Sequence, residues 1–205
     1  MHRLFAQASA LFIAALLAGC AGTPPPGTGG RVCLAELSRH DVDFRPADAE
    51  NPRDARCAVD TAVRVRRIEA ALNRPAMMSC GLASRLDEFE REIVQPAARS
   101  EFGERIARID HLGAFSCRAN TQLRGRFSEH AFGRAIDISG FRLADGTQIS
   151  VERDWSGSGA KRSFLHRIAR GACRYFSVVL TPDSNADHYN HFHFDIGPGR
   201  SCTEA

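Results

Sequence analysis

Lysine is almost missing from this sequence of 205 residues, since Lys161 is the only lysine among 27 basic residues. The basic side chains are spread along the chain without a basic block, and the formal net charge is only +3. A nucleic-acid-binding domain instead concentrates its positive charge on one patch or arm. The sequence therefore argues against a nucleic-acid partner.

Repeats are also missing, and no second Pro/Gly-rich linker follows residue 30. Hydrophobic residues make up 43% of the chain and charged residues 25%, which allows a buried core and excludes a wholly disordered protein. The length suits one domain with a tail. We therefore expect one folded domain, and we expect it to be a monomer.

The N-terminus has the pattern of an export signal. Arg3 is followed by a mostly small and apolar run over 5–17. That run is shorter than the about 20 apolar residues a helix needs to span a bilayer, so it predicts a signal peptide. The residues Leu17-Ala18-Gly19-Cys20 resemble the lipobox of bacterial lipoproteins, which implies cleavage before Cys20 and its acylation. The alternative is an ordinary secretory peptide with a cysteine near its cleavage site.

The chain thus divides into three predicted parts: a lipoprotein signal peptide over 1–20, a flexible Pro/Gly linker over 21–30 and a folded domain over 31–205. Both interpretations of the N-terminus predict an exported protein. The lipobox resemblance implies a lipid anchor on Cys20. We therefore expect a lipoprotein at the periplasmic face of a bacterial membrane, the outer membrane.

The folded domain holds an even number of cysteines, six after Cys20. In an oxidising compartment this number predicts three disulfides, although six cysteines allow fifteen connectivities. We expect neighbours along the chain to pair, as Cys33–Cys57, Cys80–Cys117 and Cys173–Cys202. Zinc thiolate ligation is the alternative, but the chain lacks the C-x-x-C pair that would support it.

Hydrophobic spacing predicts an α+β fold in which helices pack on an antiparallel sheet. We expect strands over 59–65, 106–112, 135–138, 176–180 and 191–196, and a hairpin turn over 144–146. Helices are expected over 79–91, with Ser79 as N-cap and Pro96 interrupting or ending the helix, and over 164–172.

Four of the eight histidines fall in two short segments. In the first, His130 and Asp137 flank Gly133, which can bend the chain so that both side chains point at one centre. In the second, His191 and His193 share one face of a strand, and the intervening phenylalanines share the other. A catalytic zinc needs three protein ligands and an open position. His130, Asp137 and His193 would supply two nitrogens and an oxygen, which leaves His191 free.

The two segments together resemble the signature of the lysostaphin, D-Ala-D-Ala peptidase and hedgehog-like metallopeptidases. The pattern is Ser128-x-His130-x-x-Gly133-x-Ala135-x-Asp137 followed by His191-x-His193. More narrowly, the cysteines, the segment Phe115-Ser116-Cys117-Arg118 and the flanks of both motifs resemble the bacterial extensin-like C-terminal family over roughly residues 31–202.

The metallopeptidase resemblance implies a role for each matching residue. It makes His130, Asp137 and His193 the ligands of Zn²⁺, and His191 the histidine that assists the activated water. His188 matches a further histidine of the penicillin-insensitive murein endopeptidases. Arg118 stands where D-Ala-D-Ala peptidases place an arginine that polarises the scissile carbonyl.

One position departs from the carboxypeptidase pattern, in which a glutamate precedes the last histidine ligand by three residues. Asn190 occupies that position and cannot accept a proton at neutral pH. His191 is therefore the predicted general base.

The sequence leaves two interpretations open for each of two other residues. Asp195 orients a ligand or caps a turn, and Trp155 lines a substrate groove or packs in the core.

The resemblance and the export signal together predict a zinc metallopeptidase that hydrolyses amide bonds in peptidoglycan peptides, as an endopeptidase or a carboxypeptidase. The choice of peptidoglycan as the substrate rests on analogy with the family and on the predicted export of the protein. The alternative is a non-catalytic, zinc-containing module for cell-wall binding or signalling, which the missing carboxylate at Asn190 keeps open.

Overall fold

A computed structural model describes residues 28–48, 54–120 and 125–202 of the chain. The predicted signal peptide, Cys20 and most of the predicted linker lie outside the described residues. Helix α1 (Thr28–Arg39) begins three residues inside the predicted linker, at Thr28. Among the described helices, none is long and apolar enough to cross a membrane.

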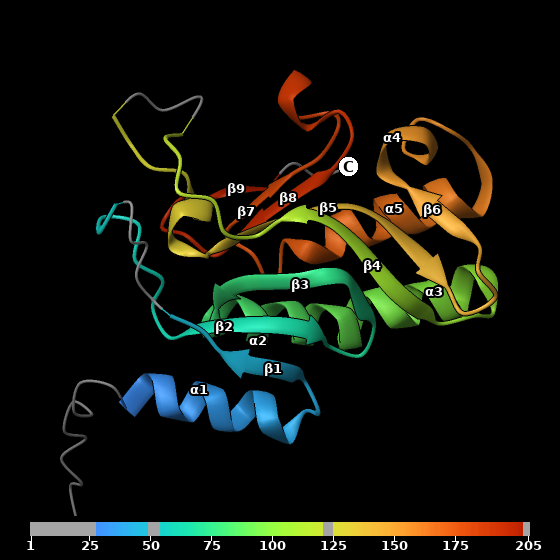
Figure 1. Ribbon diagram of the computed structural model, residues 1–205. Helices are drawn as coiled ribbons and strands as arrows, with labels where there is room; N and C mark the ends of the chain where they lie inside the picture. The colour runs from blue at the N-terminus through green and yellow to red at the C-terminus, as the bar shows by residue number, and fades with distance from the viewer. Residues whose placement is uncertain (1–27, 49–53, 121–124, 203–205) are drawn as a thin grey trace, which may run out of the picture.

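One mixed sheet runs through the molecule (Figure 1), in the order β1-β2-β3-β4-β5-β8-β7-β9, with β6 also paired to β5. The strands are β1 (Asp43–Pro46), β2 (Ala62–Arg67), β3 (Ala71–Ser79), β4 (Ile106–Gly113), β5 (Ala135–Leu143), β6 (Gln148–Ser150), β7 (Val178–Leu180), β8 (Phe192–Asp195) and β9 (Ser201–Cys202). The predicted α+β class is confirmed.

The prediction of an antiparallel sheet is correct for most pairs of strands, but β3–β4 and β7–β9 are parallel. Strands β3 and β4 are joined by α2 (Cys80–Phe89), the π-helical turn η1 (Glu90–Val94) and α3 (Gln95–Phe102). A crossover of this length returns the chain to the same end of the sheet, so the two strands run in the same direction. The sheet is therefore mixed.

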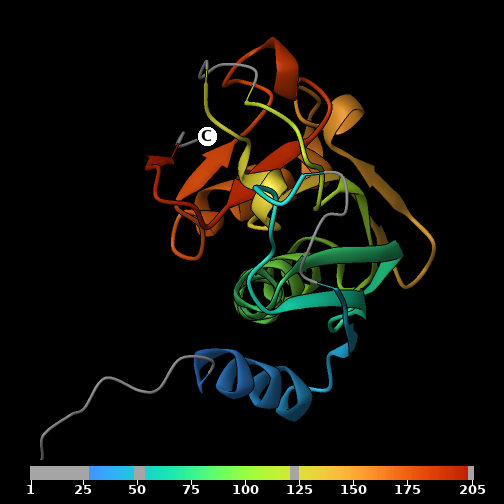
Figure 2. The same ribbon diagram turned by 60° about the vertical axis from the view of Figure 1, so that its left-hand side comes forward.

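Helices α2, α3 and α5 (Gly159–Ala172) lie along one face of the sheet, and α1 packs on α2 at the outside (Figures 1 and 2). Phe89 of α2 packs edge-on against Phe194 of β8, and Phe164 of α5 packs against Phe141 of β5. These aromatic contacts form the core. Along β5 and β8 the alternate side chains therefore face the other way, where they are free for chemistry.

The predicted helix from Ser79 is confirmed, and its first turn is capped because Leu82 N donates to Ser79 Oγ at 3.2 Å. Pro96 interrupts the run at the start of α3, after η1. The strand expected over 59–65 begins only at Ala62 because Thr61 has a positive φ of 46°, which strand geometry does not allow. The hairpin turn expected over 144–146 is confirmed, because it joins β5 to β6, and the short α4 (Val151–Asp154) follows β6 directly.

The three disulfides are present, but two of the expected pairings are wrong. Cys33 pairs with Cys80 and Cys57 with Cys117, in place of Cys33–Cys57 and Cys80–Cys117. Cys173–Cys202 is confirmed. The reason is the packing of α1 on α2, which brings Cys33 to the first residue of α2 with a Cα–Cα distance of 6.2 Å.

A buried carboxyl group ties the helices to the sheet at the junction between α2 and α3. Glu90 is fully buried and accepts hydrogen bonds from the backbone N–H groups of Glu69 and Ala70 and from the side-chain amide of Gln95. Gln95 in turn bonds both backbone groups of Ile106. Burial raises the pKa of Glu90 to about 7, against the opposing effect of these hydrogen bonds.

We predict that the contribution of Glu90 to the stability of the fold falls as the pH rises from about 4.5 to about 7. Because the pKa of Glu90 is higher in the folded than in the unfolded chain, the folded state holds a proton that the unfolded state has lost in this window. The loss amounts to at most about 3 kcal/mol. When the free energy of unfolding in urea is measured against pH, Glu90→Gln should lose this contribution. Glu104→Gln should keep the pH profile of the wild type. Parallel profiles for the wild type and Glu90→Gln would contradict the prediction.

Candidate metal centre

The three predicted metal ligands come together in the fold. His130 Nε2 lies 3.1 Å from Asp137 Oδ1 and 3.2 Å from His193 Nδ1, and His193 Nδ1 lies 3.0 Å from Asp137 Oδ1. They come from η2 (Glu129–Phe132), β5 and β8. Side chains from distant parts of the sequence thus surround one point.

Strand pairing places two of the ligands next to each other. Asp137 of β5 is directly opposite His193 of β8, so both side chains lie on the same face of the sheet. Phe192 and Phe194 point the other way and are fully buried. The predicted alternation of imidazole and phenyl rings is confirmed in β8, although the strand begins at Phe192 and His191 immediately precedes it.

A tight turn delivers the third ligand. Ser128 Oγ accepts from His130 N at the start of η2, and Gly133 ends the turn with a φ of 61°. A Cβ at Gly133 would lie 2.8 Å from Val59 Cγ1 and 2.9 Å from Ser79 N, so the position requires glycine for both conformation and space. The bend that the sequence predicts at this glycine is confirmed.

The hydrogen-bond partners of the two imidazoles leave lone pairs facing the centre. His130 Nδ1 donates to the carbonyl oxygen of Ala114 at 2.8 Å, because a carbonyl can only accept. His193 Nε2 donates to Asp195 Oδ2 at 3.2 Å. In the neutral rings the opposite nitrogens carry no proton, so two nitrogens and a carboxylate oxygen repel one another unless a cation lies among them.

The spacing of these three atoms suits zinc. Zinc–nitrogen and zinc–oxygen bonds of about 2.0–2.1 Å in a tetrahedron separate neighbouring ligand atoms by roughly 3.3 Å. The three atoms here lie 3.0–3.2 Å apart. Each imidazole is also oriented by an acceptor on its far nitrogen, which is typical of the residues behind metal ligands. The donor set and its surroundings therefore fit Zn²⁺.

The pKa shifts of His193 and Asp137 also show that positive charge among the three candidate ligands is stabilised. Burial alone would lower the pKa of His193, but its hydrogen bonds to Asp137 and Asp195 raise it to about 9. Against the effect of burial, the neighbouring His130 and His193 hold the pKa of Asp137 well below its usual range. A proton on His193 thus supplies the cation among the three atoms, and a metal ion would compete with it.

His191 stands beside the three ligands without belonging to them. Its Nε2 lies 3.6 Å from Asp137 Oδ1, and its Nδ1 donates to Asn190 Oδ1 at 2.8 Å. This bond leaves the Nε2 lone pair directed toward the centre. Asn190, the departure from the carboxypeptidase pattern, thus orients the histidine that follows it.

The other two predicted catalytic residues lie around His191. The rings of His188 and His191 are 5.0 Å apart, and His188 Nδ1 donates to Asn185 Oδ1 at 2.7 Å. Burial, followed by the nearby imidazoles, lowers the pKa of His188 to about 4, so it is neutral at pH 7. Arg118 is exposed and its charge helps to lower the pKa of His191, although burial has the larger effect.

Both open interpretations from the sequence are now resolved. Asp195 serves both roles, because Oδ2 accepts from His193 Nε2 and Oδ1 accepts from Gly197 N at 2.9 Å. Trp155 is only 2% exposed and stacks on His166, so it belongs to the core. The orienting carbonyl of Ala114 was not predicted, because a backbone acceptor leaves no signal in the residue type.

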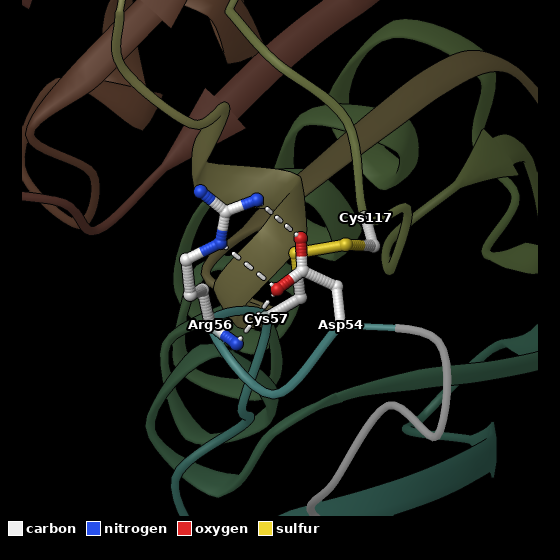
Figure 3. Close-up of a disulfide and its surroundings, with 4 residues drawn as sticks. All are labelled: Asp54, Arg56, Cys57 and Cys117. Carbon is white, nitrogen blue, oxygen red and sulfur yellow. Dashed lines mark hydrogen bonds and ion pairs between the residues drawn. A yellow bond between two sulfur atoms is a disulfide. The ribbon is translucent and has the colours of Figure 1, made fainter.

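A second group of possible metal-binding atoms, in Asp54, Cys57 and Cys117, is not a metal site. The two sulfurs are joined in a disulfide, which removes them as thiolate ligands. Figure 3 shows this disulfide with Asp54 beside it, held by Arg56 through Nε at 3.0 Å and a terminal nitrogen at 2.8 Å. This group supports the candidate metal centre indirectly, because Cys117 closely follows Ala114, whose carbonyl oxygen accepts from His130.

We predict that the Cys57–Cys117 disulfide strengthens metal binding. It anchors the segment in which Ala114 O accepts from His130 Nδ1 and Ser116 N donates to His130 O. The double variant Cys57→Ser/Cys117→Ser should bind Zn²⁺ about tenfold more weakly, since loss of the groups that orient a ligand costs this much. Competition with a chromophoric chelator measures the affinity.

The control for this prediction is Cys173→Ser/Cys202→Ser, which removes the disulfide between the end of α5 and β9. That variant should keep the wild-type affinity if its circular dichroism shows a folded protein. Equal zinc affinities for a folded Cys57→Ser/Cys117→Ser protein and the wild type would contradict the role assigned to this disulfide.

Comparison with known proteins agrees with the narrower of the two resemblances. No curated protein and no solved structure gives a significant match to the chain. A family model, described as the extensin-like protein C-terminus, matches residues 31–203. This match covers all the cysteines of the disulfides and every residue of the candidate metal centre. The chain therefore belongs to the extensin-like protein C-terminus family.

Proposed function

We propose that this protein is a zinc-dependent peptidase that hydrolyses amide bonds in peptidoglycan peptides. The observation that carries the proposal is the meeting of two imidazole nitrogens and one carboxylate oxygen within 3.2 Å, with the lone pair of His191 beside them. This arrangement matches the metallopeptidase pattern in its ligands and leaves one imidazole for proton transfer.

The residues divide the work of amide hydrolysis. His130, Asp137 and His193 would hold Zn²⁺, which when bound lowers the pKa of water and polarises a carbonyl. His191 accepts a proton from the attacking water at Nε2, because its Nδ1–H is engaged by Asn190, and passes it to the amide nitrogen as the C–N bond breaks. Arg118 supplies positive charge to the carbonyl oxygen as negative charge develops on it. Neutral His188 offers its Nε2 to a substrate N–H, since Nδ1 donates to Asn185.

The substrate class follows from the export pattern at the N-terminus. A lipoprotein anchored through Cys20 at the periplasmic face of the outer membrane would meet peptidoglycan as its nearest amide-rich polymer. The metallopeptidases that the two motifs resemble include enzymes that cleave cell-wall peptides, which supports the same substrate. The amide bond next to a free carboxyl end and the amide bond of a peptide cross-link both suit this chemistry.

The proposal predicts one equivalent of bound zinc and hydrolysis of peptidoglycan by the purified protein. His193→Ala should lose both, because it removes a ligand at the centre. Zinc affinity should also rise with pH up to about 9, where the proton that competes for His193 is lost. Zinc is measured by elemental analysis, and soluble fragments are identified by mass spectrometry. Full digestion by metal-free protein would contradict the proposal.

A second prediction separates catalysis from the alternative, a non-catalytic zinc module for wall binding or signalling. The asparagine at position 190, in place of a glutamate, keeps that alternative open. His191→Ala should keep the zinc, since His191 is not one of the three ligands, and should lower the rate of hydrolysis about 100-fold or more. Asn190→Ala should lower the rate less, because the base remains but is no longer oriented. An unchanged activity in His191→Ala would favour the non-catalytic module.

A further inference from the structure

We propose that a hollow beside the metal centre recognises a substrate group that carries both an ammonium and a carboxylate, as the free end of an amino-acid side chain can. The inference rests on the proposed peptidase function and specifies its substrate. The hollow has a volume of about 260 Å³, and its lining includes Ser139, Glu152, Arg153 and Asn190. This is below the roughly 300–1,000 Å³ of pockets for drug-sized ligands, so it suits one residue of a peptide.

Two residues of the lining, Ser139 and Asn190, are close in sequence to residues of the candidate metal centre. Ser139 follows Asp137 by two positions on β5, and its Oγ donates to the carbonyl oxygen of Asp110, which also lines the hollow. On the other side, Asn190 lines the hollow and bonds His191. A peptide whose scissile amide lies at the centre would therefore place a neighbouring residue in the hollow.

The hollow presents one unpaired charge of each sign. Glu152 and Arg153, adjacent on α4, are exposed, and within the described residues neither side chain forms an ion pair. The third charged group of the lining, Asp110, is already engaged by Arg108 Nε at 2.7 Å. A carboxylate and a guanidinium side by side complement an ammonium and a carboxylate on one ligand, whereas a ligand with a single charge would leave one of them without a partner.

Hydrogen bonds hold the short helix α4 beside the hollow, and two exposed apolar side chains lie near it in the sequence or in its lining. Ser150 N donates to Asp154 Oδ2 at 2.7 Å and Ser150 Oγ accepts from Arg153 N, which fixes both ends of α4. Leu112, which is 47% exposed, lines the hollow, and Tyr189, which is 58% exposed, is adjacent to Asn190.

Three peptides of one sequence test the inference. One bears a side chain that ends in both free groups, the second has that carboxylate amidated, and the third has that amine acetylated. For the wild type, kcat/KM should be about fivefold higher for the first peptide than for either blocked peptide, the size expected of partly solvated ion pairs. In Glu152→Gln, kcat/KM for the doubly charged peptide should fall close to that for the acetylated peptide. In Arg153→Gln, it should fall close to that for the amidated peptide. Arg200→Gln, an exposed arginine outside this hollow, should keep both ratios.

The outcomes separate this inference from the proposed function. One outcome is that the wild type hydrolyses all three peptides equally, and another is that the variants keep the wild-type ratios. Either result would show that the hollow does not bind the ammonium and the carboxylate of the substrate, while the peptidase proposal stands. If the wild type hydrolyses none of them, the peptidase proposal fails for these peptides, and calorimetric titration of the same peptides decides the inference. Tighter binding of the doubly charged peptide that is lost in both variants supports it, and equal or absent binding overturns it.

Discussion

The repulsion among three lone pairs is the physical constraint on which this structure depends. His130 and His193 each donate from their far nitrogen, to Ala114 O and to Asp195, so their near nitrogens face Asp137 as acceptors at 3.0–3.2 Å. Three acceptors at this separation are stable only around positive charge, from a proton or a metal ion. The arrangement therefore requires a cation, and its geometry fits a tetrahedral zinc ion.

Each layer of the fold contributes to holding these atoms in place. Phe192 and Phe194 bury one face of β8 in the aromatic core and so leave His193 on the open face. Gly133 ends the turn of His130, and the Cys57–Cys117 disulfide holds the segment that provides its carbonyl acceptor. Because the positioning groups are backbone and core elements, a change far from the candidate metal centre can still move the three candidate ligands.

Local patterns in the sequence predicted much of the site, whereas packing between distant elements could not be predicted. The alternation of imidazole and phenyl rings placed His193 on the correct face, and Ser79 marked the start of α2. The cysteine pairing failed because it depends on how α1 packs against α2, which brings Cys33 to Cys80. The parallel pairing of β3 and β4 depends on the helical crossover between them. The acceptors at Ala114 O and Asn190 Oδ1 became clear only from the contacts.

X-ray absorption spectroscopy at the zinc edge of the loaded protein tests the central claim most directly, because it reports the atoms bonded to the metal. The account predicts a first shell of nitrogen and oxygen only, at about 2.0–2.1 Å, with the multiple-scattering pattern of two imidazoles. A sulfur shell at about 2.3 Å, or a spectrum without imidazole, would contradict the assignment of His130, Asp137 and His193 as the ligands.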